Sequence, residues 1–182
     1  MLLDAQLNFV APGSPLSLVA GAGVAIPSPG IIDLLGLGVG VAPTERIIGL
    51  PQSGVFGADA GIGRPKPQVQ VNIGTALVAV ASSTMNVAFQ GAPDTGVGGG
   101  YQPGAWTSIV NQDGLTIAEL AALSVVFRMD WPAALPANLN ARFFRLLFTP
   151  TAAYTAGSIG SATVTMGRDD QANKYATKNF TV

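Results

Sequence analysis

The chain has 182 residues, of which 48% are apolar and only 10% charged, with a formal net charge of −1, no histidine and no cysteine. This length suits one domain with a substantial core, and the high apolar content excludes a disordered chain. The low charge, without any basic run, excludes nucleic acid as a partner, and the absence of cysteine excludes disulfides and thiolate metal sites. So few charges predict a surface that is covered by copies of the chain itself or by another partner.

The first segment, residues 1–14, is expected to be an extended N-terminal arm. No cationic stretch precedes an apolar run, so a secretory signal is not indicated and synthesis in the cytoplasm is expected. Pro12 and Gly13 interrupt the chain after a run of apolar side chains. We expect this arm to anchor the protein on a shell or on a neighbouring subunit, with an ordinary first strand as the alternative. The side chains that would anchor it are Leu2, Leu3, Leu7, Phe9 and Val10.

Residues 15–68 are rich in glycine and proline. Short apolar runs at 16–20, 31–35 and 46–50 are separated by residues that break regular structure, which predicts short strands and extended chain. The stretch 59–63 (Asp-Ala-Gly-Ile-Gly) closes this part and is expected to form a turn. The long uncharged stretch 5–32 contains four prolines and the stretch 67–93 alternates polar with apolar residues, so neither is expected to span a membrane.

Residues 69–182 are expected to form the main part of a β-sandwich, because apolar and polar residues alternate there with a period of two. Asp113-Gly114 is a strong signal for chain reversal and predicts a hairpin or sharp corner. Thr116 and Glu119 have the spacing of a helix capping box, so one short helix is expected at that point. The three clearest alternating strands carry Val69, Val71 and Ile73; Met85, Val87 and Phe89; and Ala162, Val164 and Met166.

The stretch 142–148 is apolar on both faces of a predicted strand. Phe144, Leu146 and Phe148 share one face, and the core of a sandwich covers that face. The opposite face must meet a loop, another subunit or a partner, which predicts a homodimer or homotrimer. This second face carries Phe143, Arg145 and Leu147, which we take as further interface candidates.

These elements predict an all-β fold, a jelly-roll β-sandwich with an extended N-terminal arm and at most one or two short helices, in a single domain spanning 1–182. An immunoglobulin-like sandwich and an open barrel are the alternatives. The sequence alone does not define the strand order.

The residues that most often carry out catalysis are missing, since there is neither histidine nor cysteine. Asp130 beside Trp131, or Asp169 with Asp170, could form a glycosidase pair, but solvated turns or strand ends are the preferred interpretation. The glycines at 96–100 match no phosphate-binding motif. We therefore expect no catalytic residue, no cofactor and no metal.

Three aromatic side chains suggest a second function. Trp106, Trp131 and Tyr101 could stack on a sugar, which leaves open a carbohydrate-binding jelly-roll module of a phage fibre or head spike. A polysaccharide lyase or glycosidase is a third and weaker alternative.

The sequence resembles the jelly-roll capsid cement (decoration) proteins of tailed bacteriophages, the Bordetella phage cement protein family. The resemblance covers most of the chain. The sequence departs from the pattern of that family at 41–56, which looks like an insertion, and in the glycine-rich stretch 96–100. It rests on short motifs: Met-Leu-Leu-Asp-Ala-Gln at 1–6, Ile-Asp-Leu at 32–34, the turn at 59–63, the alternating strands after Val69, Leu135-Pro136 before Arg-Phe-Phe-Arg-Leu at 142–146, and Ala156-Gly157 before the strand 159–166.

The resemblance implies a non-enzymatic structural protein of the virion. It implies attachment to the outer face of a capsid built from major capsid protein, oligomers at the symmetry axes, and a role in stabilising contacts between capsid subunits. Neither nucleic acid nor a membrane is an expected partner.

Overall fold

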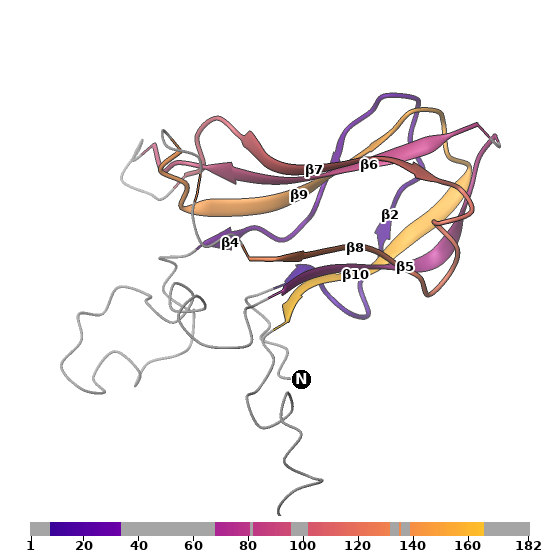
Figure 1. Cartoon of the computed structure of the whole chain (residues 1–182), viewed down its shortest axis with the longest axis horizontal. Helices are drawn as coiled ribbons and strands as arrows, with labels where there is room; N and C mark the ends of the chain where they lie inside the picture. The colour runs from indigo at the N-terminus through magenta and orange to yellow at the C-terminus, as the bar shows by residue number, and fades with distance from the viewer. Residues whose placement is uncertain are drawn as a thin grey trace, which may run out of the picture.

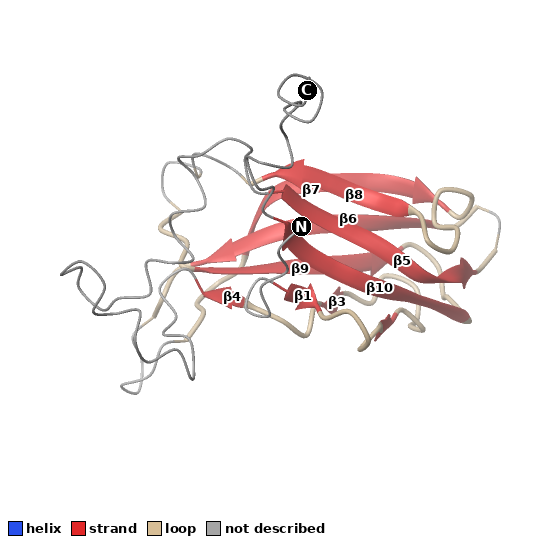
Figure 2. Cartoon of the chain, turned by 90° about the horizontal axis from the view of Figure 1, so that it is seen from below, coloured by secondary structure: helices blue, strands red, loops and turns tan. Residues whose placement is uncertain are grey.

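The fold is a β-sandwich of two antiparallel sheets packed face to face (Figures 1 and 2). This computed structural model describes residues 8–33, 68–80, 82–95, 102–131, 135 and 139–165, and these residues contain no helix. The prediction of an all-β sandwich is thereby confirmed. Figure 1 shows the two layers edge-on, and Figure 2 shows the first sheet lying across the second.

Each sheet contains five strands. The first has the order β1-β10-β5-β8, with β2 also paired to β10, and the second has the order β3-β9-β6-β7, with β4 also paired to β9. The first sheet comprises β1 (Asn8–Val10), β2 (Leu16–Ser17), β5 (Gln68–Val78), β8 (Val125–Asp130) and β10 (Ala156–Thr165). The second comprises β3 (Ile26–Pro27), β4 (Ile32–Asp33), β6 (Thr84–Ala92), β7 (Thr107–Thr116) and β9 (Phe143–Pro150).

The strand pairs are nested along the chain. β1 and β2 pair with β10, β3 and β4 with β9, β5 with β8, and β6 with β7, all antiparallel. The outermost strands in sequence therefore pair with each other, and so on inward, like one long hairpin wound into two layers. The pairs β10-β5 and β9-β6 join the turns of this winding.

The core lies between the sheets and is built from the alternating residues of the long strands. The clearest predicted strands are confirmed in β5, β6 and β10, although Met166 lies outside the described residues. An aromatic cluster occupies the centre, where the rings of Phe89 and Phe144 stack at 5.5 Å and Trp131 meets both edgewise. Phe144, Leu146 and Phe148 are all fully buried, so the predicted core face of β9 is correct.

Residues 8–10 correct the prediction of an extended arm that anchors the protein on a shell or on a neighbouring subunit. Residues 8–10 form strand β1 against β10, and the side chains of Phe9 and Val10 are 0% exposed. The Phe9 ring meets the Phe89 ring edgewise at 6.1 Å, and the Gly30 N–H donates to the Phe9 carbonyl. The alternative of an ordinary first strand therefore holds for residues 8–10, because β10 supplies both hydrogen bonds and a buried face.

The predicted reversal at Asp113-Gly114 is also wrong, since β7 continues through it. Met85 pairs with Leu115 and Val87 with Gln112, so Asp113 and Gly114 together oppose the single residue Asn86. This is a β-bulge, and Gly114 supplies its positive φ of 75°. The Gly114 N–H donates to Asn86 Oδ1 at 2.9 Å, which satisfies the donor that the bulge displaces.

The capping-box spacing forms a turn in place of the expected helix. Glu119 accepts hydrogen bonds from the backbone N–H and the hydroxyl of Thr116, at 2.8 and 2.7 Å. These bonds hold the pKa of Glu119 below its ordinary value. Only one helical turn follows, because Leu120 inserts into the core and the chain then turns toward β8.

Several predicted features lie outside the described residues. They are the runs at 34–35 and 46–50, the turn at 59–63, the glycines at 96–100, Tyr101, Asp169 and Asp170.

Tyr154 gives a first testable prediction about the core. Its side chain is 2% exposed, and its hydroxyl has no hydrogen-bond partner. Burying an unbonded hydroxyl costs roughly 1 to 3 kcal/mol, so Tyr154→Phe is expected to raise the free energy of unfolding by about 1 kcal/mol. Urea titration at pH 7 measures this difference.

The same variant should also change the response to alkali. Burial raises the pKa of Tyr154 above its ordinary value. The neutral phenol is then favoured in the folded state. The contribution of this group to the free energy of unfolding is therefore fully present below pH of about 10 and falls as the pH rises beyond it. Tyr154→Phe should reduce this alkaline loss. A Tyr154→Phe variant that is less stable than wild type both at pH 7 and above pH of about 10 would contradict the assignment of an unbonded hydroxyl.

Candidate interaction surfaces

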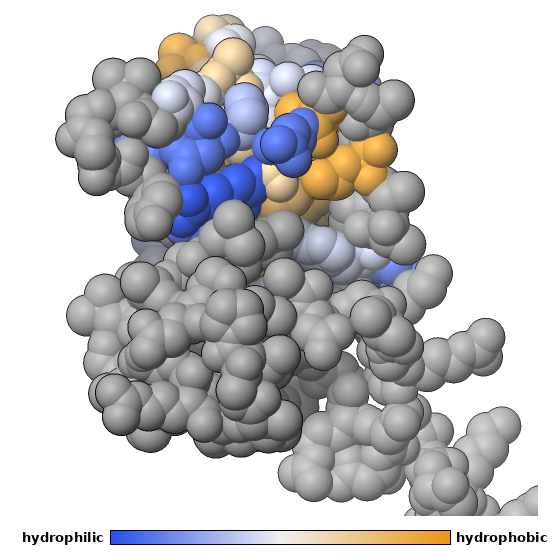
Figure 3. Space-filling view, turned by 90° about the vertical axis from the view of Figure 1, so that its left-hand side faces the viewer, coloured by the Kyte–Doolittle hydropathy of each residue, from blue (hydrophilic) through white to orange (hydrophobic). Residues whose placement is uncertain are grey.

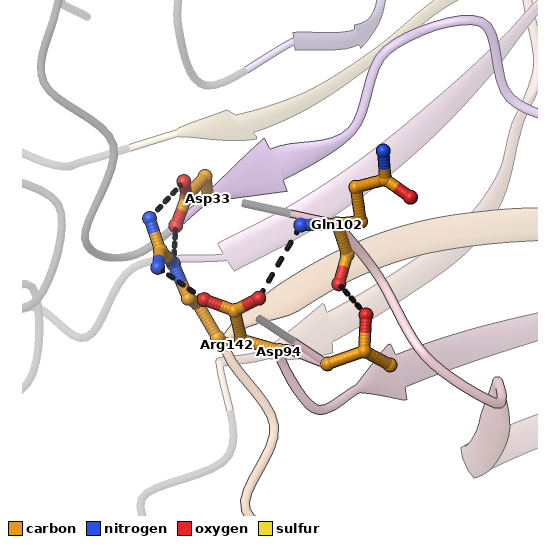
Figure 4. Close-up of polar contacts among 5 residues, drawn as sticks. Asp33, Asp94, Gln102 and Arg142 are labelled. Atoms are coloured by element: carbon orange, nitrogen blue, oxygen red, sulfur yellow. Dashed lines mark hydrogen bonds and ion pairs between the residues drawn. The ribbon is translucent and has the colours of Figure 1, made fainter. Parts of the chain in front are cut away.

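One end of the sandwich is organised around Arg142, the last residue before β9. Its guanidinium contacts both oxygens of Asp33, with Nε to Oδ1 at 2.7 Å and Nη2 to Oδ2 at 2.8 Å (Figure 4). Nη1 donates to Asp94 Oδ2 at 2.6 Å, and the other oxygen of Asp94 accepts from the Gln102 N–H. We call these residues the ion-pair end.

The ion-pair end is a tie between strands. Arg142 connects β4 to β9 and to the residues that follow β6, and its own N–H donates to the Ala92 carbonyl. Hydrogen bonding and the charge of Asp33 raise the pKa of Arg142 above its ordinary value despite partial desolvation. Seen from this end, the described residues form a hydrophilic area beside a hydrophobic one (Figure 3). Since the guanidinium already occupies both carboxylates, they are not available as metal ligands.

The opposite end, which lies at the right of Figure 1, carries most of the exposed large apolar side chains of the described residues. Backbone hydrogen bonds bring its connections together: Leu77 donates to Leu120, Thr155 to Val78 and Tyr154 to Ala20. Six of the seven large apolar side chains that are exposed in the described residues belong to these connections and to the adjoining strand ends. We call this set the apolar end: Val19, Val24, Val78, Val80, Leu123 and Val125.

Leu123 is the most exposed of these side chains, at 87%, and its backbone is strained. Its φ of 63° lies in the left-handed region, which costs an ordinary side chain roughly 1 to 2 kcal/mol. Rigid surroundings hold it there, because the Leu123 N–H donates to the Ile73 carbonyl and the Ser124 hydroxyl bonds two carbonyls of the same connection. A large apolar side chain is thus presented to solvent by a fixed loop.

The outer face of the second sheet carries a polar ladder across three strands. The Gln90 amide lies between Ser108 and Arg145, its directly opposed neighbours: Nε2 donates to Ser108 Oγ at 3.2 Å, and Oε1 accepts from Arg145 Nε at 2.9 Å. The guanidinium carbon of Arg145 lies 4.2 Å from the centre of the Trp106 ring. Trp106 therefore packs against the outward-facing Arg145, on the face of β9 that the sequence predicts to meet a loop, another subunit or a partner.

The predicted interface residues fall into three groups. Phe9 and Val10 belong to the core, and Phe143 is only 5% exposed, with the Arg142 guanidinium 5.1 Å from its ring. These three predictions are corrected, because contacts within the chain already cover the side chains. Arg145 and Leu147 lie half-buried on the outer face, as expected. Leu2, Leu3 and Leu7 lie outside the described residues.

The described tryptophans do not form a shared platform for a sugar. Trp131 packs against Phe89 and Phe144 in the central cluster, whereas Trp106 stacks under Arg145 on the outer face. Asp130, the candidate carboxylate beside Trp131, accepts from Gln68 Nε2 at 2.9 Å. Within the described ranges there is no group of three histidine, cysteine or acidic residues that could hold a metal, and no helix suited to crossing a lipid bilayer.

Sequence reasoning missed the ion-pair end and Leu123. Asp33 and Arg142 are 109 residues apart, so no local spacing marks their pairing. Leu123 follows two alanines and looks like part of an ordinary apolar turn; only its φ and exposure distinguish it.

Fold and surfaces together define a small β-sandwich with an apolar loop end and a polar outer sheet face. Comparison of the sequence with protein-family models gave no match, and comparison with curated proteins gave none either. The resemblance to phage cement proteins therefore remains a prediction.

Proposed function

We propose that this protein is a non-enzymatic capsid cement protein that binds the outer face of a phage head and stabilises contacts between major capsid protein subunits. The observation that carries the proposal is the apolar end, above all the exposed and strained Leu123. Backbone strain that persists in a folded protein is a reason to look for function at that place. Because the loop is already fixed, docking would cost little conformational entropy.

We further propose that the sandwich is a jelly roll. The nested strand pairs support this topology, since a jelly roll arranges eight strands as two Greek keys in two sheets. Eight strands result when β1 with β2, and β3 with β4, are each counted as one interrupted strand.

Protected sheet edges also suit a protein that binds through loops and faces. β7 carries register shifts at two places, β8 carries Arg128 and Asp130, and the other two edges consist of strands of only two or three residues. Bulges, charges and short strands all discourage edge-to-edge pairing. Attachment through the apolar end leaves these edges unused.

The mechanism is mass action. A protein that binds the assembled shell and not its separated subunits adds binding free energy to every occupied site. At 100 times its dissociation constant this contribution is about 2.7 kcal/mol per site. Repeated over a whole shell, it opposes the separation of capsid subunits under internal pressure.

Leu123→Asn separates folding from binding. Asparagine tolerates the left-handed backbone, so the variant is expected to be at least as stable as wild type. Loss of one leucine from a buried contact should weaken binding by about 10- to 100-fold, which corresponds to 1.5 to 3 kcal/mol. Heads from virions assembled without this protein are incubated with the purified wild-type or variant chain and then pelleted. The fraction of the chain that sediments with the heads measures binding.

Ile31→Asn is the matched control, because Ile31 is 46% exposed but lies away from the apolar end. It should bind like wild type. Equal binding by Leu123→Asn would show that the apolar end is not the docking surface. Virions with and without the protein that have identical outer surfaces by cryo-electron microscopy would contradict the cement function itself.

A further inference from the structure

The charged side chains of the described residues are nearly all paired or bridged. Arg142 binds Asp33 and Asp94, Gln68 bridges Arg128 and Asp130, and Glu119 is held by Thr116. Two charged side chains stand outside these pairs and bridges, the cation of Arg145 on β9 and the anion of Asp113 on β7, and neither forms an ion pair within the described residues. Both belong to the same sheet.

Arg145 is prepared for a carboxylate. Its Nε is fixed by Gln90 and its plane by Trp106, whereas its two Nη groups make no hydrogen bond within the described chain. Burial lowers the pKa of Arg145, and no carboxylate among the described residues offsets this loss of hydration. A guanidinium held in this way presents two parallel N–H donors, which match the two oxygens of a carboxylate.

The Asp113 side chain is exposed at the bulge of β7, and its carboxylate makes no hydrogen bond or ion pair within the described residues. Strand alternation places it on the outer face, because Asn111 opposes the outward Ala88 and Gln112 opposes the inward Val87. The bulge raises this stretch from the regular pleat of the sheet.

The positions of the two charges are related through Ala88. Arg145 opposes Gln90, and Asp113 lies opposite Asn86, so the two charges stand on opposite sides of β6 and equally far from Ala88 along it. Consider two such faces packed against each other, related by a two-fold axis that lies between them. If this axis passes over Ala88 and is perpendicular to the line that joins the two charges, each Arg145 lies over Asp113 of the other copy. The small side chain at the axis permits close approach.

We propose that two copies of this chain associate through the outer face of the β3-β9-β6-β7 sheet, with Arg145 of each copy paired to Asp113 of the other. A second copy supplies both complementary charges at once, as a self-complementary two-fold interface requires. Leu147, half-buried beside Ala88 on the same face, adds apolar contact. The pairing is independent of capsid binding, which we assign to the apolar end.

The size of the face sets the expected strength. Strands spaced about 4.8 Å apart, three of them eight to ten residues long and the fourth made of the short β3 and β4, cover on the order of 500 Å² per copy. Two such faces give about 1,000 Å², at the low end of specific interfaces. We therefore expect a reversible dimer in the micromolar range that weakens at high salt, where exposed charges are screened.

Charge reversal tests the pairing. Arg145→Glu and Asp113→Lys should each weaken the dimer at least tenfold in sedimentation velocity runs over a range of concentrations. The double variant should restore the wild-type dissociation constant to within about threefold, because the charges are exchanged and the pairs form again. Asp130→Lys, which makes the same charge change on the other sheet, should leave the dimer intact.

Asp113→Lys keeps the test valid even where Arg145→Glu disturbs the ladder with Gln90, because the exposed Asp113 carboxylate has no hydrogen bond or ion pair within the described residues to lose. A wild-type chain that stays monomeric at hundreds of micromolar, a trimer, or a double variant that fails to recover would overturn the proposal. Binding of the same variants to heads, measured in parallel, reports on the cement function separately.

Discussion

Phe9→Ala is expected to lower the free energy of unfolding by about 3 to 5 kcal/mol, the usual cost of truncating a buried phenylalanine. The ring is 0% exposed and contacts Phe89 in the central aromatic cluster. The same loss follows when residues 1–12 are deleted, because the whole of β1 then leaves β10. Urea unfolding monitored by tryptophan fluorescence measures the change, with Trp131 in the same cluster as reporter.

Val19→Ala is the matched control for this prediction, since Val19 is an apolar residue of the N-terminal part that is 57% exposed. Its effect should stay within about 0.5 kcal/mol, as for most surface substitutions. An unchanged melting temperature after deletion of 1–12 would instead support an N-terminal arm that contributes to attachment more than to folding.

The strands that could be predicted are those whose signal is local. Val69, Val71 and Ile73 alternate with polar residues because one face of β5 meets the core, and a period of two is visible in any short window. The two-faced pattern of β9 was equally readable, and it correctly placed Arg145 and Leu147 outside the core.

The errors arose where the partner of a segment lies far away in sequence. Asp113-Gly114 provides a residue with positive φ, which suits a hairpin turn and a bulge equally well. A bulge forms because β6 pairs with β7 on both sides of these two residues. Phe9 looks like part of an extended arm because its neighbour in the sheet, β10, lies some 150 residues later in the sequence. Sequence spacing contains neither fact.

For the candidate surfaces too, local sequence signals predict one part and three-dimensional placement determines the other. Apolar composition indicated that some surface must be covered, but the choice of surface depends on three-dimensional placement. Leu123 became a candidate through its backbone angle and its exposure. Arg145 is a candidate because its guanidinium stacks on the Trp106 ring and has no carboxylate partner among the described residues.

Arg142→Ala is expected to lower the free energy of unfolding by about 3 kcal/mol, the lower part of the range for breaking a buried ion pair, since the carboxylates of Asp33 and Asp94 are still 23% exposed. Two anions would then face each other at the ion-pair end without their shared cation, and β4 would lose its side-chain tie to β9. Urea titration at pH 7 measures the loss.

Two further variants identify its cause. Arg142→Lys keeps the positive charge but cannot contact both oxygens of Asp33 and Asp94 Oδ2 together, so it should recover only part of the lost stability. Adding Asp33→Asn and Asp94→Asn to Arg142→Ala removes the unpaired charges and should recover a larger part, because most of the cost comes from leaving them uncompensated. A triple variant no more stable than Arg142→Ala would show that Arg142 acts through the packing of its side chain on Phe143, and that the ion pairs add little.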